Sequence, residues 1–159
     1  LYEAGSEHVI ALDGLSVIVH PANPLRALTV EQVRALFSGR VRDWSQVGGA
    51  PGPVRLHARD DRSGTFDTFK SLVMGDAPLS PAATRYESTE QLAAAVAGDP
   101  QAVGFIGLAG VGRAKPLALS ERGTVPMAPT TLSVATEDYV LSRRLFLYSA
   151  ARPRAEVQA

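Results

Sequence analysis

The sequence predicts an α/β protein in which helices cover both faces of a mixed β-sheet. Segments with strand character alternate with segments of helical periodicity along the chain, and this alternation is the main ground for the prediction. The length of 159 residues suits one ordinary domain better than two, so these elements are expected to form a single domain. The sequence contains no internal repeat and no low-complexity tract.

The first strand and the first helix are marked by local signals. Residues 15–20 form a β-branched run that stops at Pro21, which predicts a largely buried strand. Thr29 and Gln32 have the spacing of a capping box, and Gly39 stands where a left-handed C-terminal cap belongs. A helix is therefore expected between Thr29 and Gly39.

The middle of the chain predicts a strand, a short polar loop and a helix, in that order. After the turn-rich residues 47–53, residues 54–59 alternate apolar or small side chains with polar ones, as a strand does. Apolar residues then recur at helical spacing from Phe66 to Val73. This helix is expected to open directly after Ser63, Gly64 and Thr65.

The last part of the chain is expected to contain two more helices and three short strands. Ser88 and Gln91 have capping-box spacing and predict the start of a helix that ends at Gly98. The short strands are expected at residues 103–107, 115–119 and 130–134. A final helix is expected to start near Thr136, because acidic residues near its start and arginines near its end suit the helix dipole.

Composition excludes several classes of protein. An apolar fraction of 45% and a charged fraction of 20% are typical of a globular protein. Sixteen basic residues balance sixteen acidic ones, so nucleic acid is not an expected partner. Cysteine is absent, which excludes disulfides and thiolate chemistry. His8, His20 and His57 lack metal-ligand spacing, and no metal or cofactor is predicted.

The two ends of the chain carry separate expectations. Because the chain begins at Leu1 rather than at Met, it is expected to be a processed protein or a piece of a longer one. No apolar run approaches the roughly 20 residues of a membrane span. Residues 1–14 are expected to be an N-terminal extension, residues 15–148 the domain itself, and residues 149–159 a flexible tail.

The main functional candidate is the segment that reads Arg-Asp-Asp-Arg-Ser-Gly-Thr at residues 59–65, called here the 59–65 loop. A tetrahedral oxyanion needs a dense set of fixed donors in place of its water shell. Ser63, Gly64 and Thr65 offer backbone N–H groups at a helix start and two hydroxyls, and Arg59 adds a planar guanidinium. These residue types predict an oxyanion-binding loop.

Asp61 is predicted to support this site without touching the ligand. A carboxylate is a poor direct ligand for a dianion, but it can hold the guanidinium of Arg59 through a bidentate pair. A structural alternative stays open, in which Ser63 only caps the helix and the charged residues around it form a solvated loop.

The string Arg-x-Asp-x-Ser-Gly-Thr of the 59–65 loop, followed by Phe69, resembles the phosphate-binding proteins of ABC transporters, which have the type 2 periplasmic-binding-protein fold. Residues 28–39 with Asp43-Trp44 are similar to the segment that precedes the binding loop in that family. Residues 102–107 are similar to its late Ile-Gly-Tyr strand, and residues 139–148 to its closing helix. The resemblance covers about residues 15–148.

The resemblance implies a single three-layer lobe, the second of the two lobes that family members have. A missing first lobe or a partner domain would then supply the other half of the site. Arg59, Ser63, Gly64 and Thr65 would bind phosphate or a sulfate-like anion, and Asp61 would brace Arg59. Phosphate is favoured over sulfate through the resemblance alone, because both anions accept from the same donors.

By the same resemblance the module would act in the periplasm or cell envelope, with an ABC permease as a partner, and would not be an enzyme. Two alternatives stay open. The lobe could serve as an interaction or sensor domain of a larger envelope protein without tight ligand binding. A hydrolase would use Ser63 as nucleophile, His57 as base and Asp60 or Asp61 to orient the base, although no Gly-x-Ser-x-Gly elbow is present.

Overall fold

The computed structural model of the chain describes residues 7–135, 137 and 139–148. Its strands are β1 (Glu7–Val19), β2 (Ala27–Thr29), β3 (Arg55–Arg59), β4 (Thr84–Tyr86), β5 (Ala102–Gly107), β6 (Lys115–Pro116), β7 (Ala118–Ser120) and β8 (Ser142–Tyr148). Its helices are α1 (Val30–Phe37), η1 (Trp44–Val47), α2 (Gly64–Phe69), η2 (Lys70–Met74), α3 (Thr89–Ala97), η3 (Leu108–Gly110) and α4 (Thr131–Ala135). None of these described helices is long and apolar enough to cross a membrane.

The main sheet is mixed and has the strand order β4-β3-β5-β1-β6. Strand β3 runs parallel to β4 and β5, whereas β1 runs antiparallel to β5 and β6. A separate parallel pair joins β2 to β7. The parallel part of the sheet is connected by helices, α2 and η2 between β3 and β4 and α3 between β4 and β5, as parallel strands require.

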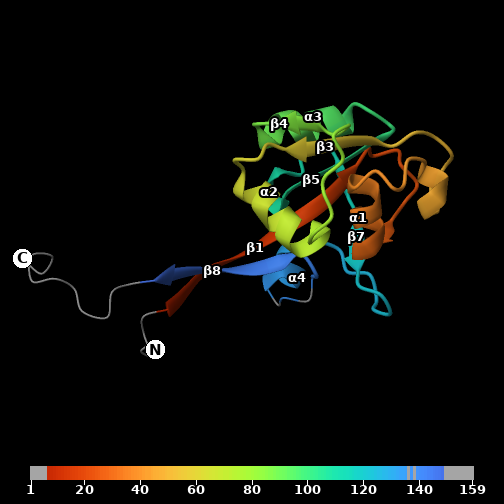
Figure 1. The fold of residues 1–159 in the computed structure, drawn as a ribbon. Helices are drawn as coiled ribbons and strands as arrows, with labels where there is room; N and C mark the ends of the chain where they lie inside the picture. Colours follow the sequence, from red (N-terminus) through yellow and green to blue (C-terminus); the bar gives the residue numbers. More distant parts are fainter. Residues whose placement is uncertain (1–6, 136, 138, 149–159) are drawn as a thin grey trace, which may run out of the picture.

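Helices cover both faces of the sheet, which confirms the predicted fold class (Figure 1). On the face of α1 and α2, the ring of Phe69 stacks on Phe105 with centroids 3.8 Å apart, and Phe37 meets both rings edge-on. On the face of α3, a smaller core joins Leu92 and Ile106 to other buried apolar residues. The helix caps follow the sequence signals, because Thr29 and Gln32 form the reciprocal capping box at α1.

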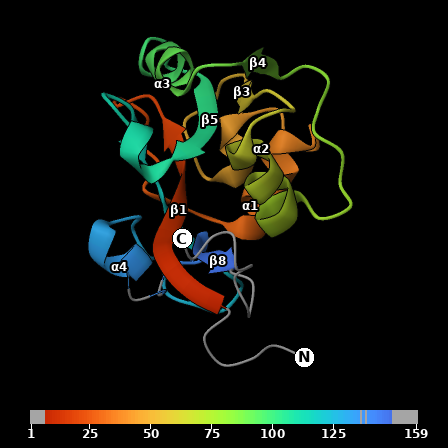
Figure 2. The same cartoon turned by 90° about the vertical axis from the view of Figure 1, so that its left-hand side faces the viewer.

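Strand β1 is longer than expected and serves two purposes. Its second half, from Leu15 to Val19, lies in the main sheet beside β5. Its first half pairs antiparallel with β8, from Glu7 opposite Tyr148 to Gly14 opposite Ser142. The pair of strands projects from the helix-covered body, and α4 and β8 flank β1 there (Figures 1 and 2). Residues 7–14 of the expected N-terminal extension therefore belong to strand β1. The expected boundary between extension and domain, after residue 14, falls inside this strand.

Two expectations for the C-terminal part are wrong. Residues 130–134 were expected as a strand because they are β-branched, but residues Thr131–Ala135 form the helix α4. Hydrogen bonds from the N–H of Ser133 to Thr130 Oγ1 and from the N–H of Thr130 to Ser133 Oγ, 3.0 and 2.9 Å long, stabilise this helix start. The expected final helix is strand β8, because pairing with β1 overrides its local helical pattern. Thr136, Asp138 and residues 149–159 lie outside the described residues.

Candidate functional site

The 59–65 loop runs from the last residue of β3 into the first turn of α2, which confirms the predicted order of strand, loop and helix. The helix begins at Gly64 and not after Thr65 as expected. Ser63 is the N-cap of α2, with its backbone extended at φ −75° and ψ 133°. Its Oγ accepts hydrogen bonds from the N–H groups of Thr65 and Phe66, at 3.1 and 3.4 Å. The helix continues beyond Phe69 as the π-helical segment η2, which no sequence signal indicated.

The cap reduces the number of backbone donors that the loop offers to a ligand. The N–H of Thr65 donates to Ser63, and the N–H of Ser63 donates to the carbonyl of Asp60 at 3.1 Å. The N–H of Gly64 stands in the first helical turn, where no intrahelical acceptor exists. Ser63 Oγ accepts two N–H groups, and its own proton can still be donated, although the residue is only 8% exposed. The Thr65 hydroxyl makes no hydrogen bond within the described part of the chain.

Gly64 lies on an open surface. A Cβ atom added at this position would meet no atom within 4 Å other than those of its chain neighbours and of the α2 backbone. The φ angle of Gly64 is not in the left-handed region that favours glycine. Neither packing nor backbone conformation therefore requires a glycine here. What the glycine provides is unobstructed access to the main chain at the helix start, which is the feature an oxyanion site needs.

Arg59 is held in place by the last residue of β4 and by two residues that follow this strand. Its Nε donates to the carbonyl of Tyr86 at 3.3 Å, Nη1 to the hydroxyl of Thr89 at 2.6 Å, and Nη2 to the carbonyl of Glu87 at 3.0 Å. Three of the five N–H groups of the guanidinium are thereby used, which leaves two for a ligand. The positive charge of Arg59 is thus fixed at the edge of the loop before any ligand arrives.

The structure corrects the predicted pairing of Asp61. Its carboxylate pairs with Arg85 of β4, while backbone carbonyls and Thr89 take the place it was expected to have beside Arg59. The reason lies in the sheet, where β4 runs parallel to β3 with Arg59 in register with Tyr86. This register brings both the Tyr86 carbonyl and the Arg85 side chain next to the loop. The Asp61 side chain itself is 81% exposed.

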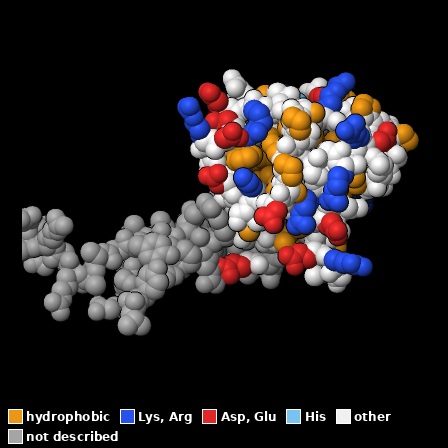
Figure 3. All heavy atoms as spheres, viewed as in Figure 1, with side chains coloured by type: hydrophobic (Ala, Val, Ile, Leu, Met, Phe, Trp, Pro, Cys, Tyr) orange, Lys and Arg blue, Asp and Glu red, His pale blue; other side chains and the backbone are white. Residues whose placement is uncertain are grey.

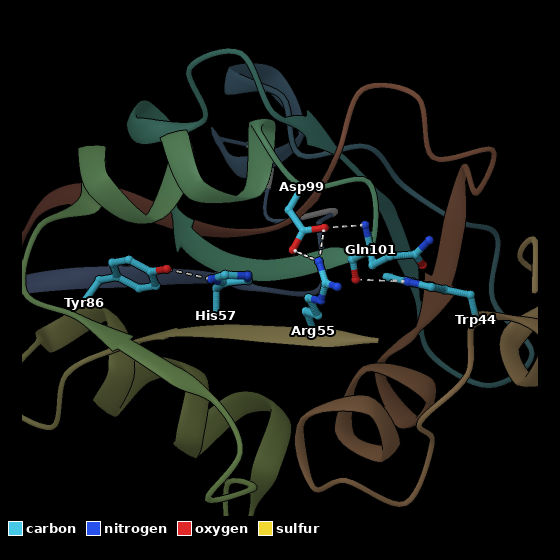
Figure 4. Close-up of polar contacts among 6 residues, drawn as sticks. All are labelled: Trp44, Arg55, His57, Tyr86, Asp99 and Gln101. Carbon is cyan, nitrogen blue, oxygen red and sulfur yellow. Dashed lines mark hydrogen bonds and ion pairs between the residues drawn. The ribbon is translucent and has the colours of Figure 1, made fainter. Parts of the chain in front are cut away.

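His57 lies beside Tyr86 and makes its side-chain hydrogen bond with that residue (Figure 4). Its Nδ1 lies 2.9 Å from the Tyr86 hydroxyl, and its Nε2 is buried without a hydrogen-bond partner in the described residues. Burial lowers the pKa of His57 below its ordinary value of 6.5, Arg55 lowers this pKa further, and Asp99 opposes the shift. Since Ser63 Oγ bonds to helix N–H groups and His57 bonds to Tyr86, the first link of a hydrolase triad is not formed.

The other side chains drawn in Figure 4 hold the segment between α3 and β5 against β3 and η1. Arg55 Nη1 lies 3.1 Å from both carboxylate oxygens of Asp99, and the N–H of Trp44 Nε1 donates to the carbonyl of Gln101 at 3.1 Å (Figure 4). Trp44 is 2% exposed, so its role is structural. The described residues contain no group of three or more side chains suited to hold a metal ion. Acidic and basic side chains are interspersed over the face seen in Figure 3, without a field of one sign.

No sequence pattern indicated the residues that support the loop from β4 and beyond. These are Arg85, Thr89 and the carbonyls of Tyr86 and Glu87. Strand β4 has three residues, too few to show a period, and it follows a long stretch of turns and bends. Its proximity to the loop arises only when it pairs with β3, so no local pattern indicates it.

The sequence matches the PBP superfamily domain over residues 4–157, and the chain belongs to this family. Its fold is that of the type 2 periplasmic-binding proteins, of which the described residues form a single lobe. Among solved structures, an ABC-type phosphate transport receptor from Vibrio cholerae superposes with a TM-score of 0.82 at 29% identity. That superposition covers 98% of this chain and 65% of the other.

Named relatives agree with this assignment. The phosphate-binding protein PstS of Bacillus subtilis (strain 168) is 27% identical over 133 residues, which are 84% of this chain and 43% of PstS. The protein SphX of Synechocystis is 32% identical over 151 residues, which are 87% of this chain and 45% of SphX. The chain therefore spans about half the length of the curated relatives it matches.

Proposed function

We propose that this chain is an extracytoplasmic solute-binding module that binds phosphate, or a similar tetrahedral oxyanion, at the 59–65 loop. Its role would be in an ABC-type phosphate uptake system and not in catalysis. The relatives support the ligand class, because PstS is named a phosphate-binding protein and the Vibrio cholerae protein a phosphate transport receptor. Family membership alone does not assign a ligand, so the proposal depends on the loop.

The observation that carries the proposal is the placement of Arg59 and Gly64 at the two ends of one short loop. Arg59 retains two N–H groups that no described residue uses, and Gly64 leaves open space above the helix start. The hydroxyls of Ser63 and Thr65 lie between and beside them and have protons to donate. A phosphate oxygen atom accepts from such donors with about 1.5–3 kcal/mol for each charge-assisted hydrogen bond.

The proposed partners of the module follow from the β1–β8 pair. This pair projects from the body of the lobe, and both strands run toward residues outside the described part (Figure 1). We propose that the two strands connect this lobe to the first lobe or to a partner domain, which would supply the remaining ligands. The assembled protein would deliver phosphate to an ABC permease from the periplasm or cell envelope.

A second candidate function is that of an interaction or sensor domain that holds no ligand tightly. The observation in its favour is the helix cap, because Ser63 Oγ engages the N–H groups of Thr65 and Phe66. A loop that satisfies its own donors has fewer to offer a ligand. In this case the 59–65 loop would be structural and the surface of the lobe would carry the function.

Crystallisation of the chain from phosphate distinguishes the two functions. We expect density for one tetrahedral ion within hydrogen-bond distance of Arg59, Gly64 and Thr65. The same crystals of the Arg59→Ala variant should lack this ion, and those of Arg122→Ala, a change at an exposed turn residue, should retain it. An empty loop in the unchanged chain would contradict the phosphate proposal and favour the interaction domain.

A further inference from the structure

We propose that Arg85 is the positioning residue of the 59–65 loop, which it clamps at its start, in its middle and at the helix that follows. The inference rests on the proposed function, since it names what holds the oxyanion loop in shape. Arg85 would not touch the ligand. It would set the distance between Arg59 and the helix start and would compensate the negative charge of Asp61.

Three contacts carry the inference, and each reaches a different part of the loop. Arg85 Nε donates to the carbonyl of Arg59 at 2.8 Å, which fixes the end of β3. Its Nη2 pairs with the carboxylate of Asp61 in the middle of the loop. Its Cζ lies 4.6 Å from the ring centroid of Phe66, in the first turn of α2, within cation–π range. One rigid, planar guanidinium thus joins strand, loop and helix.

The position of Arg85 in the sheet makes this clamp independent of a ligand. Strand β4 pairs in parallel with β3, with Arg85 in register with Ala58 and Tyr86 with Arg59. The same strand end supplies the Tyr86 carbonyl to Arg59 Nε, so β4 holds Arg59 by both its main chain and its side chain. A donor set that is ordered in advance loses less conformational entropy when it binds.

The second effect of Arg85 is electrostatic. Asp61 stands two residues before Ser63, and its carboxylate is a negative charge close to a proposed anion site. Pairing with Arg85 compensates this charge. Because the Asp61 side chain is 81% exposed and that of Arg85 35%, the ion pair adds little to folding stability. The effects of Arg85 should therefore appear in loop order and in anion affinity and not in global unfolding.

The first test measures loop order without phosphate. The N–H groups of Thr65 and Phe66 donate to Ser63, so their hydrogen exchange reports whether the helix start is formed. In Arg85→Gln we expect both amides to exchange about tenfold faster at an unchanged unfolding temperature. Arg85→Lys should also speed exchange, because an ammonium group cannot make the several directed hydrogen bonds of a planar guanidinium. Arg122→Gln is the matched control and should leave both rates unchanged. Unchanged exchange in Arg85→Gln would overturn the inference.

The second test measures phosphate affinity by NMR titration of the same variants. We expect Arg85→Gln to weaken the binding of inorganic phosphate about three- to tenfold. Arg85→Lys should lose less affinity than Arg85→Gln, because lysine keeps the positive charge. In the Arg85→Gln background, where the ion pair with Asp61 is already lost, Asp61→Asn should restore part of the phosphate affinity, because it removes the uncompensated negative charge. A double variant that binds phosphate no better than Arg85→Gln would overturn the charge-compensation part of the inference.

The two tests separate the inference from the function on which it rests. If the unchanged chain shows no response to phosphate at the loop, the proposed function fails, and hydrogen exchange still decides whether Arg85 clamps the loop. If the chain binds phosphate and Arg59→Ala abolishes binding while Arg85→Gln changes neither exchange nor affinity, the inference fails and the function stands.

Discussion

Gly64 is the residue at which the structural and the functional explanations of the 59–65 loop make opposite predictions. An added Cβ would meet no atom, and alanine is a better helix residue than glycine. If the glycine matters only for folding, replacing it should do no harm. If it keeps the main chain open to an anion, replacement should reduce binding while the fold remains intact.

We expect Gly64→Ala to unfold at the same temperature as the unchanged chain or higher, with a stability gain of at most about 1 kcal/mol. Phosphate affinity should fall, because the new methyl group lies over the N–H of the helix start. Thermal unfolding followed by circular dichroism measures the first effect, and an NMR titration measures the second. A clear loss of stability with unchanged phosphate affinity would assign Gly64 a structural role.

His57 offers a residue-scale prediction about pH. Burial is the main cause that lowers its pKa in the folded protein below the ordinary 6.5, and Arg55 adds to the shift. The unfolded chain therefore binds more protons at this position than the folded one when the pH falls through 6.5 and below. The stability that the neutral imidazole contributes is present above this range and is lost as the pH falls.

We expect the free energy of unfolding to decrease between about pH 7.5 and about pH 5.5, and to decrease less in His57→Gln than in the unchanged chain. Urea denaturation at the two pH values measures this slope. Arg122→Gln, a change at an exposed turn residue, serves as the control and should keep the slope of the unchanged chain. An identical slope in His57→Gln would show that His57 does not titrate in this way.

At the scale of elements, the close packing of α3 against the sheet depends on Gly104 in β5. A Cβ at Gly104 would lie 2.8 Å from Leu92 Cδ2, 3.0 Å from Val96 Cγ2 and 3.3 Å from the carbonyl of His57. Gly107 in the same strand is different, because a Cβ there would meet nothing within 4 Å. The two glycines therefore separate the effect of packing from the effect of glycine itself.

We expect Gly104→Ala to lower the free energy of unfolding by about 1–3 kcal/mol, because the added methyl group overpacks the interface of α3 with β5. Gly107→Ala is the matched control in the same strand and should change it much less. Chemical denaturation of both variants under one set of conditions measures the difference. Equal effects of the two substitutions would contradict the packing explanation.

The elements also show which parts of the fold the sequence predicts well. Where side-chain caps set the start of a helix, the prediction is confirmed, as with Thr29 at α1 and Ser88 at α3. It fails where a distant partner decides the structure, because β8 becomes a strand only by pairing with β1. At α4 the β-branched composition misled the prediction. The three-residue spacing of Thr130 and Ser133, which exchange hydrogen bonds at the helix start, was the informative signal.

The same distinction applies to the candidate site. The residues of the 59–65 loop are contiguous, so the sequence predicts their place at the junction of β3 and α2, and the structure confirms that place. The partner of Asp61 and the three acceptors of Arg59 depend on the register of β4 with β3. That register joins segments more than 20 residues apart, and no local pattern encodes it.

At the scale of the whole molecule, the chain matches about half of each curated relative, and this sets the affinity we expect. Each charge-assisted hydrogen bond contributes about 1.5–3 kcal/mol, but ordering costs reduce the sum. We propose that residues outside this chain supply further donors. The isolated chain should then bind phosphate no tighter than about 1 mM, or about 4 kcal/mol. Micromolar binding in titration calorimetry would contradict the proposal of a half site.

The most direct test of the account is a phosphate titration of the isotopically labelled chain, followed residue by residue in NMR spectra. We expect the amide signals of Gly64 and Thr65 to move progressively with a dissociation constant of about 1 mM or weaker, and to stay in place in Arg59→Ala. The account would be contradicted if both signals stayed unmoved up to about 100 mM phosphate, or if the largest changes lay away from the 59–65 loop.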